Sequence, residues 1–244
     1  MKRDEVNVLY DRAYADSYDA KFIHRDICQS DSSFEVKVLA KALERRPSWL
    51  DVGCGTGYFL SQFPGHHRAG LDISAAMLER ARAASPDATF YQHDFRVPRP
   101  EWQNAWGLVS SMWHAYGYVD TLNEFEQFLN NICDWTALDG SLFLPYLDLN
   151  GLWETALPFD MPNPYQPAKV HIMALIWTYI DADKVHRNMI APHAEHIRGL
   201  LQRRFHQVNV IDYPPAMPGW QIVRKAFLAE HKRKTEVVLP RPSD

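Results

Sequence analysis

The stretch Trp49-Leu50-Asp51-Val52-Gly53-Cys54-Gly55-Thr56-Gly57-Tyr58 decides the fold of this 244-residue chain. A short apolar run ends in an acidic residue, alternating glycines follow, and a second apolar run begins at Tyr58. Glycine permits a tight turn with positive φ and lets a ligand approach the bare backbone, and a new helix offers unpaired N–H groups beside that ligand. The stretch therefore predicts a buried strand, a turn and a helix facing a ligand. Its G-x-G-x-G spacing differs from the G-x-G-x-x-G of dinucleotide-binding proteins, and no G-K-[ST] follows as in a phosphate-binding loop.

Two further strands are predicted to end in acidic residues. His67 to Asp72 reads as the second strand, and Asp72 lies about 20 residues beyond the glycine turn, the spacing at which a doubly wound sheet places a carboxylate against a ribose. Ser74 is placed to cap the helix that follows. A third strand, residues 89–93, ends at Asp94-Phe95.

These three regions resemble the class I S-adenosylmethionine (SAM)-dependent methyltransferases. The matching stretches are LDVGCGTG, GLDISAAMLERARA and FYQHDF, which lie within the first two thirds of the chain, whereas the last third matches only in its order of elements. The resemblance implies an α/β fold: a doubly wound, mostly parallel seven-stranded sheet with an antiparallel last strand and a small antiparallel β lid insert. It also implies SAM as the cofactor.

In this family the acid after the second strand binds the ribose. The acid after the third strand reads the adenine amino group, and its neighbour's backbone reads a ring nitrogen. The alternative for Asp94 is that it only starts a turn, since Asp is common at strand ends. The cofactor-binding residues implied by the resemblance are Tyr10, Tyr18, Asp51, Gly53, Cys54, Gly55, Gly57, Asp72, Ile73, Met77, Asp94, Phe95 and Met112.

An N-terminal helix is predicted over residues 6–22, because Tyr10, Tyr14 and Tyr18 recur at four-residue spacing and share one helical face. Two interpretations remain equal. The tyrosines pack the helix on the domain, or they form a lid over the cofactor, as the Y-D-x-x-A-x-x-Y-D segment of related methyltransferases suggests.

A polar and aromatic cluster follows the fourth predicted strand, residues 106–112. Ligands of open α/β sheets bind beyond the carboxyl ends of the strands, so Trp113 and Tyr116 are candidate substrate contacts. His114 is the candidate general base, or at least orients the nucleophile, because an unperturbed histidine pKa near 6.5 suits proton removal near neutral pH. The alternative is that His114 packs between the two aromatic residues with one ring nitrogen bonded to backbone.

Residues 150–190 are predicted to form a lid over the substrate. Residues 150–167 read as an irregular loop rich in proline and aromatic residues, and 170–180 with 184–190 as a hairpin. Antiparallel inserts at this place form substrate lids in several small-molecule methyltransferases, including the aminosugar N-methyltransferases. A sheet extension that only buries core is the alternative. The candidate walls of the substrate site are Trp153, Tyr165 and Trp177.

The remaining elements complete one domain over residues 1–244. They comprise helices at 33–43, 122–138 and 192–205, a fifth strand at 141–146 after a turn at Asp139-Gly140, and a closing antiparallel pair at 208–213 and 221–229. The charged tail, 232–244, is expected to be mobile.

Composition limits the partners and the compartment. The net charge of −4 and the pI near 6.2 argue against a nucleic-acid surface, and no apolar run reaches the length of a membrane span. Met1 to Glu5 lacks an apolar signal region. The three cysteines form no C-x-x-C pair, which favours reduced thiols in the cytoplasm. A homodimer is left open.

No metal site is predicted. His186, His193 and His196 invite a zinc interpretation, but surface histidines at such spacing are common and methyl transfer requires no metal. Cys54 reads as a small buried residue rather than a nucleophile, because no positive partner is evident.

The predicted function is transfer of a methyl group from SAM to an oxygen or nitrogen of a small molecule, sugar-like or natural-product-like. An RNA or protein methyltransferase would require a basic face or an added recognition domain, and neither is visible. A catalytically silent SAM-fold binding protein remains the third class.

Overall fold

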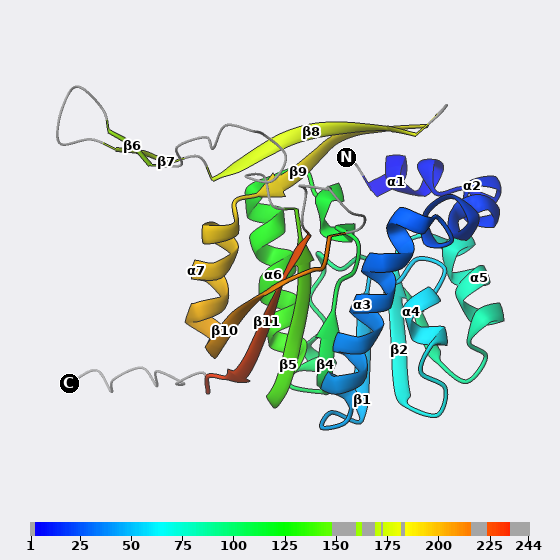
Figure 1. Ribbon diagram of the computed structural model, residues 1–244, viewed down its shortest axis with the longest axis horizontal. Helices are drawn as coiled ribbons and strands as arrows, with labels where there is room; N and C mark the ends of the chain where they lie inside the picture. Colours follow the sequence, from blue (N-terminus) through cyan, green and yellow to red (C-terminus); the bar gives the residue numbers. More distant parts are fainter. Residues whose placement is uncertain are drawn as a thin grey trace, which may run out of the picture.

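A seven-stranded sheet forms the centre of the computed structural model, which describes residues 3–147, 160–162, 169–171, 173–181, 184–215 and 224–234 (Figure 1). The strand order is β10-β11-β5-β4-β1-β2-β3. Strand β11 pairs antiparallel with both of its neighbours, and the other pairs are parallel. The predicted doubly wound sheet with an antiparallel last strand is therefore confirmed. The strands are β1 (Ser48–Val52), β2 (His67–Asp72), β3 (Thr89–Gln92), β4 (Trp106–Ser110), β5 (Thr136–Tyr146), β10 (Phe205–Asp212) and β11 (Lys225–Lys232).

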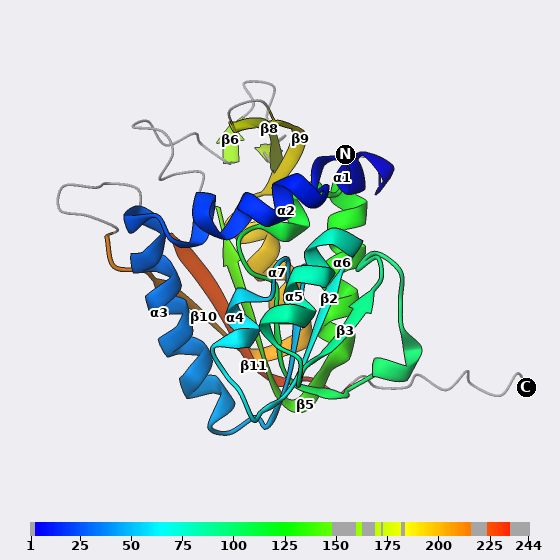
Figure 2. The same ribbon diagram turned by 90° about the vertical axis from the view of Figure 1, so that its right-hand side faces the viewer.

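Helices cover both faces of this sheet (Figure 2). Strand side chains alternate between the faces, so in β1 Trp49 packs with the helices of one face and Leu50 with those of the other. The first face carries α3 (Asp26–Leu43), α4 (Tyr58–Ser61) and α5 (Ala75–Ala84), and the second carries α6 (Leu122–Trp135) and α7 (Ala194–Arg204). Both layers leave the carboxyl ends of the parallel strands free for a ligand.

The predicted single helix over residues 6–22 is wrong. The segment divides into α1 (Arg3–Leu9), α2 (Arg12–Tyr18) and a π-helical turn (Asp19–Ile23). The break falls at Asp11, whose side chain accepts a hydrogen bond from the N–H of Tyr14 at 2.8 Å and so caps α2. Aspartate competes with helix hydrogen bonding in this way because its short carboxylate reaches the backbone two or three residues on.

The boundaries around the fifth strand also differ from the prediction. Helix α6 ends at Trp135 rather than near Leu138, and β5 begins at once with Thr136. The expected turn at Asp139-Gly140 lies inside β5, where the pairing with β4 shifts register between Trp106 and Leu108. Between these pairs β5 advances five positions, Thr136 to Ser141, and β4 advances two, so an irregularity in the pairing takes the place of the predicted turn.

The predicted antiparallel insert is confirmed as a hairpin of β8 (Ala174–Asp181) and β9 (Lys184–Pro192), separate from the main sheet. It lies at the same end of the sheet as α1 and α2 (Figures 1 and 2). A second short pair, β6 (Asp160–Pro162) and β7 (Lys169–His171), precedes it. Trp153, Tyr165 and the tail beyond residue 234 lie outside the described residues.

Within the part of the chain that the structure describes, no helix is both long and apolar enough to cross a bilayer. Cys28, Cys54 and Cys133 are free thiols.

Candidate functional site

The glycine turn after β1 takes the left-handed conformation that its sequence predicts. The φ angles of Gly53, Gly55 and Gly57 are 75°, 54° and 75°. A Cβ on Gly53 would lie 2.4 Å from the Cβ of Ala115, and one on Gly57 would lie 2.9 Å from that of Ala81, whereas one on Gly55 would meet nothing within 4 Å. Two of the glycines therefore allow close packing, and Gly55 leaves bare backbone beside open space.

Asp72 connects the end of β2 to this turn. Its Oδ2 accepts a hydrogen bond from the N–H of Gly55 and its Oδ1 accepts one from the N–H of Ser74, both at 2.8 Å. Burial raises the pKa of Asp72, and these backbone donors oppose the rise. Because both donors belong to rigid backbone, the carboxylate has a fixed orientation on the cavity wall.

Asp51 is a second carboxylate on that wall, and it is buried. The hydroxyl of Ser110 donates to its Oδ1 at 2.7 Å, and the indole N–H of Trp49 donates to Ser110 Oγ at 2.9 Å. Burial raises the pKa of Asp51 to about 7, against the lowering effect of the Ser110 hydrogen bond. Its protonation can therefore change near neutral pH.

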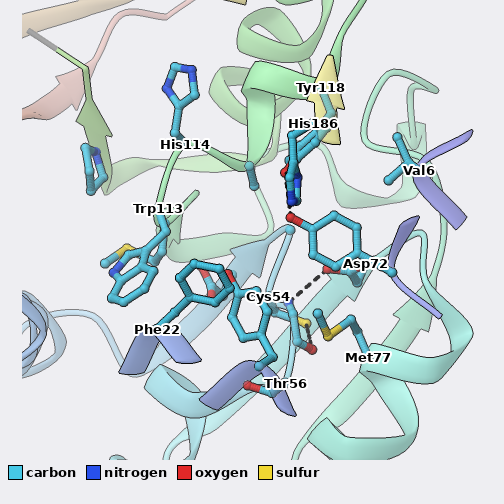
Figure 3. A pocket seen from close by; sticks show the side chains of 18 of the residues that line it. Val6, Phe22, Cys54, Thr56, Asp72, Met77, Trp113, His114, Tyr118 and His186 are labelled. Carbon is cyan, nitrogen blue, oxygen red and sulfur yellow. Dashed lines mark hydrogen bonds between the residues drawn. The ribbon is translucent and has the colours of Figure 1, made fainter. Parts of the chain in front are cut away.

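A cavity of about 400 Å³ lies beyond the carboxyl ends of the strands, between the glycine turn, the N-terminal helices and the β8–β9 hairpin (Figure 3). Its volume is within the range of small-molecule sites. The predicted site residues on its wall are Tyr10, Tyr18, Asp51, Gly53, Cys54, Gly55, Asp72, Ile73, Met77, Asp94, Phe95, Met112, Trp113, His114 and Trp177.

Two predicted site residues lie elsewhere. Gly57 is the N-cap residue of α4 and packs against Ala81 of α5, and it is not on the cavity wall. Tyr116 has no exposed surface, its ring packs against those of Phe125 and Phe128, and its hydroxyl donates to the carbonyl of Pro145 at 3.1 Å. The 3₁₀ turn at Ala115–Tyr118 points Tyr116 into the core, whereas Ala115 and Tyr118 line the cavity.

Asp94 accepts hydrogen bonds from Arg96. The guanidinium Nε lies 3.0 Å from Oδ1 and Nη2 lies 2.9 Å from Oδ2, and the N–H of Arg96 also donates to Oδ1 at 2.9 Å. Asp94 thus starts the turn that the alternative interpretation describes, and it also lines the cavity.

Two consecutive non-glycine residues with left-handed backbone follow β4. The φ angles of Trp113 and His114 are 53° and 62°, a conformation that costs energy for residues with a Cβ and that clusters at functional sites. The indole N–H of Trp113 donates to Oε2 of Glu35 at 2.9 Å, and Tyr213 donates to the other oxygen of this buried carboxylate at 2.8 Å. These contacts hold the strained segment in place.

His114 is packed against Tyr116 and bonded to backbone, as the second interpretation made from the sequence describes, and its role as a base stays a prediction. Its Nε2 donates to the backbone carbonyl of Ile190 in β9 at 2.9 Å, and its Nδ1 is buried and has no hydrogen-bond partner among the described residues. Burial lowers the pKa of His114 to about 4, with a smaller contribution from the charge of Arg224. The ring is therefore neutral near pH 7, and the hydrogen bond to Ile190 fixes its tautomer, leaving Nδ1 as the acceptor.

Gly117 provides the room for this ring. A Cβ on Gly117 would lie 2.4 Å from Cδ2 and 2.6 Å from Nε2 of His114.

The N-terminal tyrosines contribute to the cavity rather than only to the core. Tyr10, Tyr14 and Tyr18 line it, and their rings contact one another at centroid distances of 5.3–6.2 Å. Tyr14 is also buried, so the tyrosines both pack on the domain and line the cavity, and a lid over the cofactor stays a prediction.

Tyr118 and His186 are among the cavity-wall residues that were not predicted from the sequence. The Tyr118 hydroxyl lies 2.6 Å from Nδ1 of His186 and 2.6 Å from the hydroxyl of Tyr10, and Nε2 of His186 lies 3.1 Å from the hydroxyl of Tyr14. Tyr118 belongs to the aromatic run after β4, which was a usable signal. The sequence marked His186 only as one of three histidines considered for zinc, because only the folding of β9 over the N-terminal helices brings it to the cavity.

The described residues contain no group of three metal-ligating side chains. His193 caps α7 by accepting the N–H of Glu195 at 3.1 Å, and His196 lies 2.9 Å from Glu126.

Comparison with known proteins gives a family match over most of the chain. The protein-family model described as a methyltransferase domain matches residues 32–205. The dTDP-3-amino-3,4,6-trideoxy-alpha-D-glucopyranose N,N-dimethyltransferase of Streptomyces venezuelae is 35% identical over 48% of this chain and 49% of its own length. The trans-aconitate 2-methyltransferase of Enterobacter sp. (strain 638) is 41% identical over 50% of this chain and 44% of its own length. The chain spans about half the length of these curated relatives.

A solved structure shows a similar fold over a larger share. DesVI of Streptomyces venezuelae superposes with a TM-score of 0.59 and 22% identity, covering 90% of this chain and 98% of DesVI.

Proposed function

Because the chain belongs to the family of methyltransferase domains, we propose that it transfers a methyl group from SAM to a nitrogen or oxygen of a small molecule, sugar-like or natural-product-like. The proposal agrees with the resemblance seen in the sequence. The observation that carries it is the joining of Gly55 and Asp72, at 2.8 Å, on the wall of a cavity within the size range of small-molecule sites.

The residues around the glycine turn fit SAM. The fixed carboxylate of Asp72 retains lone pairs for the two ribose hydroxyls, and Gly55 leaves the backbone open to the ligand. Asp51, Ile73, Met77, Phe95 and Met112 supply the remaining cofactor wall. When bound, SAM supplies a methyl group already activated on a sulfonium.

The protein has three tasks: to hold the acceptor in line, exclude water and guide a proton. Aromatic and apolar side chains make up much of the cavity wall and exclude water. We assign His114 to orienting the nucleophile, because its neutral ring presents Nδ1 as an acceptor for an N–H or O–H. An acceptor left without a partner in a buried site costs roughly 1–3 kcal/mol, which favours a role completed by substrate.

We propose that residues 150–190 cover the substrate. The described part of this insert contributes Trp177, Tyr179, His186 and Met189 to the cavity wall. Lys184 also pairs with Asp11 of the N-terminal segment at 2.9 Å. The roles of Trp153 and Tyr165 stay predictions.

The finer expectations on partners and place also stay predictions. We propose a small-molecule substrate rather than a nucleic acid, because the net charge of the chain is −4. We propose a cytoplasmic location, because the three cysteines are free thiols. A homodimer is tested by light scattering on the purified protein.

The experiment that tests the function combines calorimetry with SAM and transfer of labelled methyl groups. The acceptors are a dTDP-aminosugar, trans-aconitate, and protein, RNA and small-molecule fractions of a cell extract. Label in small molecules supports the proposal, label in RNA or protein supports the second class, and SAM binding without any transfer supports a silent binding protein. Absence of SAM binding refutes the proposal.

A further inference from the structure

We propose that Tyr118 and His186 form the route by which a proton leaves the acceptor, with Tyr118 receiving that proton while it passes its own to Nδ1 of His186. This inference rests on the proposed methyl transfer and assigns the proton to the lid hairpin rather than to His114.

The geometry places a continuous hydrogen-bonded chain on the cavity wall. It runs from the hydroxyl of Tyr10 to that of Tyr118 at 2.6 Å, on to Nδ1 of His186 at 2.6 Å, and from Nε2 of His186 to the hydroxyl of Tyr14 at 3.1 Å. All four side chains line the cavity. Figure 3 shows Tyr118 and His186 side by side, apart from His114.

The donors and acceptors of this hydrogen-bonded chain are ordered in the direction that proton removal requires. When Nε2–H of His186 donates to Tyr14, Nδ1 is the acceptor and must receive the hydroxyl proton of Tyr118. The Tyr118 oxygen then keeps lone pairs for further donors: the Tyr10 hydroxyl is one, and an N–H or O–H of the acceptor in the cavity is the other.

Tyr118 cannot act as a standing base. Burial raises its pKa well above the ordinary value, and burial raises that of Tyr10 as well. Tyr118 therefore remains a phenol near neutral pH and must lose its proton as it gains another.

The step balances as a double proton transfer. The acceptor's N–H or O–H bond breaks and its electron pair stays on that atom, while a new O–H bond forms on Tyr118. The former O–H bond of Tyr118 breaks and an N–H bond forms at Nδ1, so His186 becomes an imidazolium with a charge of +1.

The aromatic and charged groups around His186 differ from those around His114. Among the described residues, the rings of Tyr10, Tyr14, Tyr118 and Tyr179 lie beside that of His186, and the centroid of the Tyr179 ring is 5.3 Å away. Of the nearby charges, Lys184 is paired with Asp11, and Lys21 and Lys184 lie over the ring of Tyr14 at 5.0 and 5.7 Å.

His114, by contrast, is held neutral by burial and by the charge of Arg224. In this proposal His114 orients the nucleophile, and His186 accepts the proton through Tyr118.

The first test needs neither SAM nor an acceptor. The protein is labelled with ¹⁵N-histidine and studied by NMR at pH 7.5. We expect the His186 ring to carry its proton on Nε2, and the ¹⁵N chemical shift of Nδ1 to lie in the range of a non-protonated nitrogen. The signals missing from the spectrum of His186→Gln are those of His186. Tyr118→Phe should change the ¹⁵N chemical shift of Nδ1 while leaving Nε2 protonated. A proton on Nδ1, or an imidazolium at this pH, overturns the proposal.

The second test is kinetic and uses a dTDP-3-amino-3,4,6-trideoxyglucose acceptor, or the small-molecule fraction that the wild type methylates. We expect His186→Gln and Tyr118→Phe each to lower kcat by roughly 10²–10⁴, and His186→Gln to remove the acidic limb of the pH profile. Lys184→Met is the matched control, because it breaks the ion pair between the hairpin and Asp11 and removes no donor or acceptor of the hydrogen-bonded chain.

The outcomes are distinct. If Lys184→Met and His186→Gln both raise KM and leave the shape of the pH profile unchanged, His186 only fastens the hairpin and the proposal is wrong. If the wild type binds no SAM in calorimetry, the proposed methyl transfer itself fails, and the nitrogen signals still decide the state of His186.

Discussion

The main-chain N–H of Gly55 donates to the carboxylate of Asp72 across 17 positions of the chain, at 2.8 Å. The bond joins the turn after β1 to the end of β2, and Ser74 completes the arrangement from the helix that follows. A charged acceptor held by two backbone donors needs no reorganisation when a ligand arrives.

The first prediction follows from that arrangement. Asp72→Ala should weaken SAM binding roughly 10- to 100-fold, because hydrogen bonds to a charged group contribute about 1.5–3 kcal/mol. Calorimetry measures the change, with Asp139→Ala, an exposed carboxylate within β5, as the control. Equal affinity in Asp72→Ala and wild type would contradict the ribose assignment.

A pair of glycines separates backbone strain from ligand contact. Gly55 and Gly65 both have positive φ, 54° and 86°, and a Cβ on either would meet no atom within 4 Å. Gly55→Ala and Gly65→Ala should each lower the free energy of unfolding by about 1–2 kcal/mol, measured with urea. Only Gly55→Ala should also weaken SAM binding, because its methyl group enters the cavity. If both variants bind SAM equally well, Gly55 does not face the cofactor.

The sequence predicted the parts of the site that arise from local chemistry. Gly53 and Gly55 are required by a turn, and Asp72 by its position at a strand end, so their places follow from patterns of a few residues. Tyr116 shows the limit of this reasoning. A run of aromatic residues after β4 marks the right region, but the 3₁₀ turn decides which rings face the cavity and which face α6.

His186 illustrates why the rest could not be predicted. It is 68 positions from Tyr118 and 172 from Tyr14, and its neighbourhood exists only once the hairpin lies over the N-terminal helices. Similarly, the break at Asp11 depends on one side chain competing with helical hydrogen bonds, which the four-residue spacing of the tyrosines conceals.

The buried carboxylate of Asp51 predicts a pH dependence of stability. Its pKa is near 3.9 in an unfolded chain and about 7 in the folded protein. The folded state therefore holds this proton more tightly, so its contribution to stability is complete below pH about 4 and is lost as the pH rises through about 7. In urea unfolding of the ligand-free protein between pH 4.5 and 7.5, wild type should lose stability relative to Asp51→Asn by up to about 1.4 kcal/mol per pH unit. A difference that stays constant with pH would show that Asp51 is not protonated in the folded protein.

The last prediction concerns the space that Gly117 leaves for His114. Gly117→Ala would bring a methyl group within 2.4 Å of Cδ2 of His114, so the ring must move and its hydrogen bond to Ile190 must lengthen or break. We expect a lower kcat with unchanged SAM affinity, because the glycine turn and Asp72 are not touched. His114→Gln should give a similar loss, and combining the two changes should add little, since both act on one side chain. Gly199→Ala in α7, where a Cβ would meet nothing within 4 Å, is the control, and it should raise stability by about 0.5–1 kcal/mol with kcat unaltered. If the losses from Gly117→Ala and His114→Gln are instead fully additive, the two residues act independently and His114 does not depend on this space for its position.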